Sequence, residues 1–549
     1  MTAFGESGGT CGTYLRTAYS DGCSAEDRIT LSQTGTKQDI FTEGPQWAMT
    51  VPEKEATCES TPGTRRWLEV ALRYLPQSQF GRRVSILGAG ALANQALQAL
   101  TVPIIGRLYG PVNIGDWALL QSMAAVVATV SGLRYELAVV VADTEEEATS
   151  AALVQILSNV FIAGVLLCIV SFFARYLARV VGAQELAAWL FTVPVVAFLT
   201  SMFGLASNWL IRAAQFQVLA RITLVQSGVT VAVQVLAALL FRPGLDCLVL
   251  GVIIGQVASI GAIRNLVCVK RGAAVARHLS GEALWRAARK HSEFPKYTAP
   301  WSLVGALRER GLVILLGMFG TVRVIGFYAM ALRLVWAPQG LASTSLSAVL
   351  FQRAAEEADV ANVGPLVLTV NLKIILLATP IFLFLAWWSG DLIALLLGEQ
   401  WRGAGIYVSV LCTPALGFVL QGWLVRLLSV SGHQHVGFIT EAAYSVAALA
   451  SFGTALAIRR NAPFAVGAFT VITVLYQVAF LIVCYRCCRF PSRDLVRLGY
   501  SFLSLAAGIA AVFGTVALLP ATHIKMYIDA LALVIYYAVL SYRSRPSST

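Results

Sequence analysis

Charged residues are scarce in this sequence of 549 residues. Asp, Glu, Lys and Arg make up 13% of the chain, whereas soluble domains carry roughly 25%. Hydrophobic residues make up 57%, and the mean hydropathy is +0.71. So little charge excludes a large soluble core. It indicates an all-α polytopic membrane protein, in which helices satisfy the backbone polar groups.

Two common enzyme motifs are also missing. The sequence has no nucleotide-binding loop of the form G-x-x-x-x-G-K-[ST] and no H-E-x-x-H zinc motif, and its five histidines are scattered. Ten cysteines are present, but most lie in apolar segments, and "CYRCC" (Cys484 to Cys488) has no second ligand pair nearby. We therefore expect no enzyme activity, no metal site and no cofactor.

Basic residues outnumber acidic ones, which gives a net charge of +12. In a membrane protein this excess indicates cytoplasmic loops beside anionic head groups, so we expect no nucleic-acid partner. Basic residues are densest from Lys270 to Lys296 and from Arg486 to Arg497. The fourteen membrane helices that the sequence predicts are given below. The first basic stretch follows the sixth of them and the second follows the twelfth, so both stretches follow an even-numbered helix. The positive-inside rule therefore predicts that both chain termini are cytoplasmic.

Residues 1–80 are polar and are predicted to form a disordered cytoplasmic tail, with a short amphipathic helix at 65–75. Apolar blocks of about 20 residues then repeat, as membrane-spanning helices require. They predict fourteen helices, near 84–106, 114–141, 149–173, 187–209, 218–241, 246–269, 297–320, 324–350, 365–388, 404–428, 436–458, 463–486, 497–519 and 526–542.

An internal repeat divides these helices. "LYGPVNIGDWALLQ" (Leu108–Gln121) and "MFGTVRVIGFYAMAL" (Met318–Leu332) share two glycines, an aromatic residue and an alanine in the same order. The second glycines, Gly115 and Gly326, are 211 positions apart (326 minus 115). This offset spans six predicted helices, and an even number preserves topology. The pattern predicts two parallel six-helix lobes, related by a pseudo-two-fold axis along the membrane normal.

The repeat sets the predicted domain borders. Residues 81–290 form the first lobe and a basic cytoplasmic loop, residues 291–490 form the second lobe, and residues 491–549 form two further helices and a short tail.

Ionisable residues inside the predicted helices are candidates for function, because they are costly in a membrane. The candidates are Arg134 and Glu136 in the second helix, Arg308, Glu309 and Arg310 in the seventh, Arg333 in the eighth and Arg426 in the tenth. Helical geometry predicts that Arg134 and Glu136 point apart. Several arginines with few acids indicate an anionic ligand, although a buried ion-pair network between the lobes is the alternative. Asn94 and Gln98, four positions apart, would line a polar cavity or bond between helices.

Two stretches resemble a known family. "RLYGPVNIGDWALLQSMAAVVATVSGLRYELAVVVADTEEEA", from Arg107, and "FPKYTAPWSLVGALRERGLVILLGMFGTVRVIGFYAMALRLVWAPQGL", from Phe294, resemble bacterial polysaccharide biosynthesis proteins. These are O-antigen-type flippases of the multidrug/oligosaccharidyl-lipid/polysaccharide exporter superfamily. The resemblance covers roughly residues 82–490. It implies a V-shaped pair of lobes around a cationic cavity that accepts the pyrophosphate of a lipid-linked glycan.

The flippase hypothesis that this resemblance suggests gives the candidate residues their roles. Arg134, Arg308, Arg310, Arg333 and Arg426 would bind the pyrophosphate. Glu136 and Glu309 would pair with arginines when the site is empty. The two extra helices would form a groove for the lipid tail.

The resulting hypothesis is a monomeric flippase in the bacterial inner membrane, serving O-antigen, lipopolysaccharide or exopolysaccharide synthesis. It would move a polyprenyl-pyrophosphate-linked oligosaccharide from the cytoplasmic to the periplasmic leaflet. Its partners would be that ligand, membrane lipids, and the glycan polymerase and glycosyltransferases of the same pathway. One alternative is a cation-coupled multidrug exporter, which would need an acidic cavity. The other is a membrane glycan polymerase or ligase, which would need a substantial outer loop.

Overall fold

The computed structural model describes residues 79–263, 280–336, 360–424, 427–428, 431–518 and 525–543, and these contain helices and no strands. All of them belong to one compact unit, Arg73–Thr549. The predicted tail and its amphipathic segment lie outside the described residues, apart from the last two positions of the tail, which begin the first described helix.

In the first half of the chain, the described residues form seven α-helices. They are α2 (Gln79–Leu108), α3 (Pro111–Ser131), α4 (Tyr135–Val141), α5 (Glu145–Val180), α6 (Thr192–Arg212), α7 (Phe216–Leu240) and α8 (Leu245–Ile263). The short helix α10 (Gly281–Lys290) lies between this half and the next.

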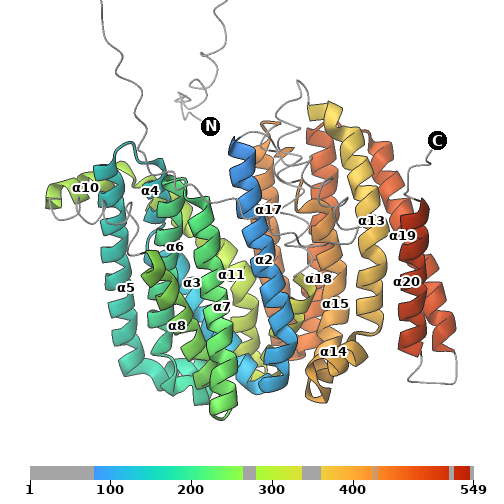
Figure 1. Ribbon diagram of the computed structural model, residues 1–549, viewed down its shortest axis with the longest axis horizontal. Helices are drawn as coiled ribbons and strands as arrows, with labels where there is room; N and C mark the ends of the chain where they lie inside the picture. The colour runs from blue at the N-terminus through green and yellow to red at the C-terminus, as the bar shows by residue number, and fades with distance from the viewer. Residues whose placement is uncertain are drawn as a thin grey trace, which may run out of the picture. The chain divides into compact units, whose positions relative to one another are not determined.

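The second half begins with α11 (Ala299–Phe319), and residues 322–336 are also helical. Its further helices are α13 (Gly364–Trp387), α14 (Ser389–Leu397), α15 (Gly405–Gln421), α17 (Gln434–Arg459) and α18 (Ala462–Cys487). The last two helices are α19 (Ser492–Ala517) and α20 (Lys525–Arg543). The described helices lie side by side, with α2 and α11 in the middle of the view (Figure 1).

Ten helices in the described part of the chain are long and apolar enough to cross a membrane. The helix α11, which carries Arg308, Glu309 and Arg310, is not among them. The predicted all-α, two-lobed membrane fold is confirmed. The count of fourteen spanning helices and the predicted domain borders stay predictions.

The second predicted helix, 114–141, is wrong in one respect, because it is broken. The helix α3 ends at Ser131, and α4 begins at Tyr135. Between them, Leu133 and Arg134 adopt left-handed φ angles of 50° and 62°. Ser158 of α5 donates a hydrogen bond of 3.0 Å to the carbonyl of Ser131. This bond satisfies one of the carbonyls that lack a helical partner where α3 ends.

The extra helix α20 docks on α13 through tyrosine hydroxyls. Pro380 lies inside α13 and has no N–H, so the carbonyl of Leu376 loses its normal helical donor. Tyr536 of α20 donates to this carbonyl at 3.1 Å, and Tyr537 donates to the next one, that of Leu377, at 2.6 Å. The two hydrogen bonds fix α20 against the second lobe.

The two lobes pack together mainly through α3 and α11, and through α2 and α14. One buried apolar cluster includes Leu119 and Leu120 of α3 together with Leu312 and Leu316 of α11. The helix α11 also packs on α17. It therefore lies between the first lobe and the rest of the second, and its side chains can interact with both.

Candidate functional site

The two repeat glycines meet where the lobes join. A methyl group on Gly115 of α3 would collide with the carbonyl oxygen of Val322, and one on Gly326 would collide with that of Pro111. Val322 and Pro111 are themselves 211 positions apart (322 minus 111), as the glycines are. The contact is therefore reciprocal, as a pseudo-two-fold relation between the lobes requires. Only glycine lets two backbones approach this closely.

Polar contacts reinforce the same end of the lobe junction. The guanidinium of Arg107, in the last turn of α2, donates to the carbonyls of Leu395 at 2.8 Å and Leu396 at 2.9 Å, near the end of α14. The indole of Trp401 donates to the carbonyl of Gly106 at 2.7 Å. The lobes are therefore closed where α2 ends and α3 begins.

Arg333, in the helical segment 322–336, crosses the lobe junction. Its guanidinium lies over the indole ring of Trp117 of α3, 4.1 Å from the ring centre. In the part of the chain that the structure describes, no acid forms an ion pair with Arg333. Arg310 of α11 lies within electrostatic range of Arg333 and repels it. The junction thus carries two positive charges and one aromatic face, an arrangement suited to an anion.

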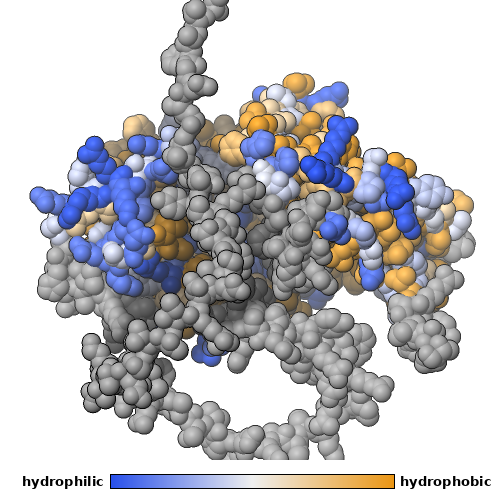
Figure 2. Space-filling model, turned by 90° about the horizontal axis from the view of Figure 1, so that it is seen from above, coloured by the Kyte–Doolittle hydropathy of each residue, from blue (hydrophilic) through white to orange (hydrophobic). Residues whose placement is uncertain are grey.

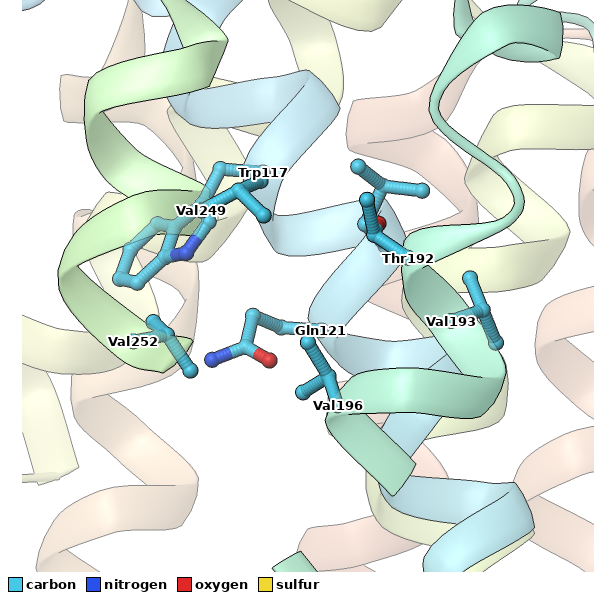
Figure 3. Close-up of a pocket in the computed structure, with 8 residues that line it drawn as sticks. Trp117, Gln121, Thr192, Val193, Val196, Val249 and Val252 are labelled. Carbon is cyan, nitrogen blue, oxygen red and sulfur yellow. The ribbon is translucent and has the colours of Figure 1, made fainter. Parts of the chain in front are cut away.

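The small pocket beside Trp117 is not the ligand site. Trp117 and Gln121 of α3 line it together with Thr192 and Val196 of α6 and Val252 of α8 (Figure 3). The cavity volume is about 10 Å³, which is roughly the space that one water molecule needs. The closed conformation therefore has no room here for a pyrophosphate or a sugar.

Arg308 takes part in a polar network within the second lobe. Its guanidinium forms a short ion pair with Glu441 of α17 and lies 3.5 Å from the hydroxyl of Ser445. The same carboxylate accepts a hydrogen bond of 2.6 Å from Tyr476 of α18. The Arg308 side chain is 19% exposed and lies 5.4 Å from the centre of the Tyr444 ring. Arg308 therefore joins three helices rather than standing alone.

The neighbours of Arg308 behave differently. Glu309 and Arg310 are exposed, and a carboxylate oxygen of Glu309 lies 3.8 Å from the Arg308 guanidinium. The structure therefore brings Glu309 near an arginine, but the main partner of Arg308 is Glu441.

Arg134 and Glu136 form an ion pair at 2.9 Å, with side chains 29% and 10% exposed. The prediction that they point apart is wrong, because it assumed a continuous helix. The left-handed conformation of Arg134 turns its side chain back toward Glu136. The Nε atom of Arg134 is buried without a hydrogen-bond partner. Arg134, Arg308 and Arg333 each contact a different partner, namely Glu136, Glu441 and Trp117.

The acidic run after α4 binds the short helix α10. Lys290 contacts Asp143 at 2.9 Å and Glu147 at 2.7 Å, and His291 contacts Glu147 at 2.6 Å. The hydrogen bond from Lys290 lowers the pKa of Asp143, and its two carboxylate partners raise the pKa of Lys290. Hydrophilic side chains gather over α10 and the start of α5, at the left of Figure 2. We name Asp143, Glu147, Lys290 and His291 the α10 latch.

Three other candidates take no clear part in a site. Asn94 is half-buried, and its Oδ1 atom has no hydrogen-bond partner. Gln98 is exposed. Arg426 lies outside the described residues.

Glu441 and Trp117 are two site residues that were not among the candidates from the sequence. Glu441 lies in the predicted helix 436–458, so the rule that selected Arg308 would also have selected this acid. Trp117 belongs to the repeat, but no sequence signal pairs it with Arg333.

Comparison with known proteins decides the family. A family model described as "Polysaccharide biosynthesis protein" matches residues 104–405, more than half of the chain. The chain belongs to this polysaccharide biosynthesis protein family. The match spans the lobe junction and includes Arg134, Arg308 and Arg333. A comparison with curated proteins finds no match.

Solved structures agree on the fold of this family member. The lipid II flippase MurJ, in its inward closed conformation, has a TM-score of 0.61 and 12% sequence identity, covering 83% of this chain and 97% of that chain. An inward-facing multidrug resistance MATE transporter of the MOP superfamily has a TM-score of 0.50 and 14% identity, covering 79% of this chain and 98% of that chain. At 12% and 14% identity, these likenesses show the fold that this chain shares with the two transport proteins.

Proposed function

We propose that this protein flips a polyprenyl-pyrophosphate-linked oligosaccharide or repeat unit from the cytoplasmic to the periplasmic leaflet of the bacterial inner membrane. The observation that carries the proposal is Arg333, placed over Trp117 at the lobe junction without an acidic partner among the described residues. An unpaired cation inside a membrane protein costs free energy unless an anionic ligand binds to it. Membership of the polysaccharide biosynthesis family supports a glycan-linked ligand.

The closed end of the junction supports alternating access. With both termini cytoplasmic, as the basic loops predict, the contacts of Gly115 with Val322 and of Arg107 with α14 close the periplasmic side. The ligand would then enter from the cytoplasmic side, while its polyprenyl tail stays in the lipid. Rocking of one lobe against the other would open the periplasmic side.

Within this proposal, each candidate residue has a role. Arg333, Arg310 and Arg308 hold the pyrophosphate, whose oxygens suit the planar guanidinium fork. Arg134 and Glu136 form a charge pair near the predicted cytoplasmic entrance.

Replacing Arg308 with alanine tests the proposal in cells. We expect Arg308→Ala to abolish surface glycan export, because a pyrophosphate-binding charge is lost, while protein level and membrane insertion stay normal. Export is measured as surface polysaccharide in a strain that lacks its own copy of this gene. The matched control is Arg323→Ala, because Arg323 is an exposed arginine of the same lobe. Wild-type export from well-expressed Arg308→Ala protein would contradict the role.

A further inference from the structure

Glu441 is a partly buried charge, 33% exposed, that the proposed function does not explain. It lies on α17, opposite Arg308 of α11 and Tyr476 of α18. In the proposed function, Arg308 binds the ligand. In this structure, however, the Arg308 guanidinium is already paired with the Glu441 carboxylate. The question is what happens to this ion pair when a phosphate arrives.

The Glu441 carboxylate is held independently of Arg308. Its second oxygen accepts the hydroxyl of Tyr476 at 2.6 Å. The Tyr476 ring stacks on Tyr444 with a centroid distance of 4.1 Å and an angle of 12° between the ring planes. The hydroxyls of Tyr444 and Thr473 lie 3.1 Å apart. The stacked Tyr476 therefore gives the carboxylate a second anchor besides Arg308.

Arg308 is less firmly held than its partner. Apart from Glu441, its polar neighbours are distant, with Ser445 at 3.5 Å and Glu309 at 3.8 Å. A guanidinium has five N–H donors, so several remain for another acceptor. The side chain is 19% exposed, less than the 33% of Glu441, so its freedom to turn comes from these unused donors and not from exposure. Arg308 can therefore turn toward a ligand while Glu441 stays where Tyr476 holds it.

We propose that Glu441 is an internal competitor for Arg308, which the phosphate of the ligand must displace and whose return helps to release the ligand. This inference rests on the proposed function and deepens it. The ligand gains the arginine but leaves Glu441 without its cation, which reduces the net gain from binding. A carrier benefits from such a balance, because its ligand must bind well enough to enter and weakly enough to leave.

A simple positioning role makes the opposite prediction. If Glu441 only held Arg308 in the orientation that contacts the ligand, removing the carboxylate would make the arginine side chain more mobile. Ligand binding would then become weaker. If Glu441 competes for Arg308, removing its charge strengthens binding and slows release. The direction of the change therefore separates the two roles, and a general loss of stability would not strengthen binding.

The experiment measures the affinity of purified full-length protein in detergent for radiolabelled farnesyl pyrophosphate, a short prenyl pyrophosphate used as the probe. We expect Glu441→Gln to bind the probe about tenfold more tightly than the wild type, because the competing charge is gone. Export by Glu441→Gln in cells should fall, because release slows. Arg308→Ala should bind the probe weakly.

Two further variants control for misfolding and for a general effect of removing a negative charge. Glu441→Asp retains the charge but withdraws it from Arg308, and should bind more tightly than the wild type even if Glu441→Gln does not fold. Glu309→Gln removes an equal charge near Arg308 without removing the close partner, and should change the affinity less than Glu441→Gln does.

Each failure has its own meaning. Unchanged or weaker binding by folded Glu441→Gln or Glu441→Asp would overturn the competitor role, as would an equal gain from Glu309→Gln. If the wild type does not bind the probe, or if Arg308→Ala binds it as well as the wild type, the proposed ligand site itself is wrong.

Discussion

At the scale of single residues, the arginines differ in how their charge is balanced. Arg134 is paired with Glu136, and Arg308 is paired with Glu441. Arg333 instead faces the indole of Trp117. An aromatic face stabilises a cation without neutralising it, and such contacts contribute about 2 kcal/mol when desolvated. Arg333 is therefore the arginine best prepared to receive an anion.

Trp117 should hold Arg333 in position for the ligand. We expect Trp117→Leu to weaken binding of farnesyl pyrophosphate about tenfold, since the aromatic face is lost. Trp117→Phe should keep much of the affinity, because it retains a ring. Equal binding by the wild type and Trp117→Leu would show that the ring contact does not matter.

At the scale of elements, the α10 latch joins the first lobe to the chain segment that leads into the second. Lys290 and Asp143 are exposed, at 53% and 79%, whereas Glu147 and His291 are largely buried, at 13% and 10%. Exposed pairs contribute little and are weakened by salt. Because Lys290 lowers the pKa of Asp143, this carboxyl stays charged, and the pair stays intact, until the pH falls through that lowered pKa. The Lys290–Asp143 pair is thus weak, whereas the contacts of Glu147 with Lys290 and His291 are better shielded from salt.

Removing the latch should free α10. We expect Lys290→Gln to increase hydrogen exchange of the amides in α10, as high salt should in the wild type. Hydrogen exchange with mass spectrometry measures the change, and Arg289→Gln is the matched control, because Arg289 is exposed and has no ion pair among the described residues. Similar exchange in both variants would mean that the latch does not hold α10.

The element scale also shows how far the sequence could be interpreted. Apolar blocks located most helices, because a membrane demands long hydrophobic runs. The break between α3 and α4 could not be predicted from the sequence, because Leu133 and Arg134 are not residues that favour left-handed backbone. The pairing of Arg308 with Glu441 was equally hidden, because 133 positions separate them and only the packing of α17 on α11 brings them together.

At the scale of the whole molecule, the reciprocal glycine contact relates the two lobes. The sequence predicted it in part, because the equal spacing of Gly115 and Gly326 marked an internal repeat. It could not show that the two copies touch each other. The contact stabilises the closed end of the junction, and any side chain there would force the lobes apart.

Alanine at either glycine should therefore disfavour this conformation. Gly115→Ala or Gly326→Ala inserts a methyl group against a backbone carbonyl of the other lobe. We expect lower export and greater labelling of Cys introduced at Ile114, which is fully buried in this conformation, by a thiol reagent added from outside, since that end no longer closes. Gly164→Ala, where a methyl group meets no neighbour within 4 Å, is the control. Unchanged labelling in the Gly115 and Gly326 variants would contradict the role of this contact.

The central claim is that this protein moves a pyrophosphate-linked glycan lipid between leaflets by means of an arginine at the lobe junction. The most direct test reconstitutes the purified protein in vesicles that contain a polyprenyl-pyrophosphate-linked sugar. A membrane-impermeant enzyme added outside then measures how much sugar lipid becomes accessible from the inner leaflet. We predict rapid transfer by the wild type and almost none by Arg333→Gln. Transfer at equal rates by both proteins would contradict this claim. So would the absence of transfer by wild-type protein that is folded and inserted in the vesicles.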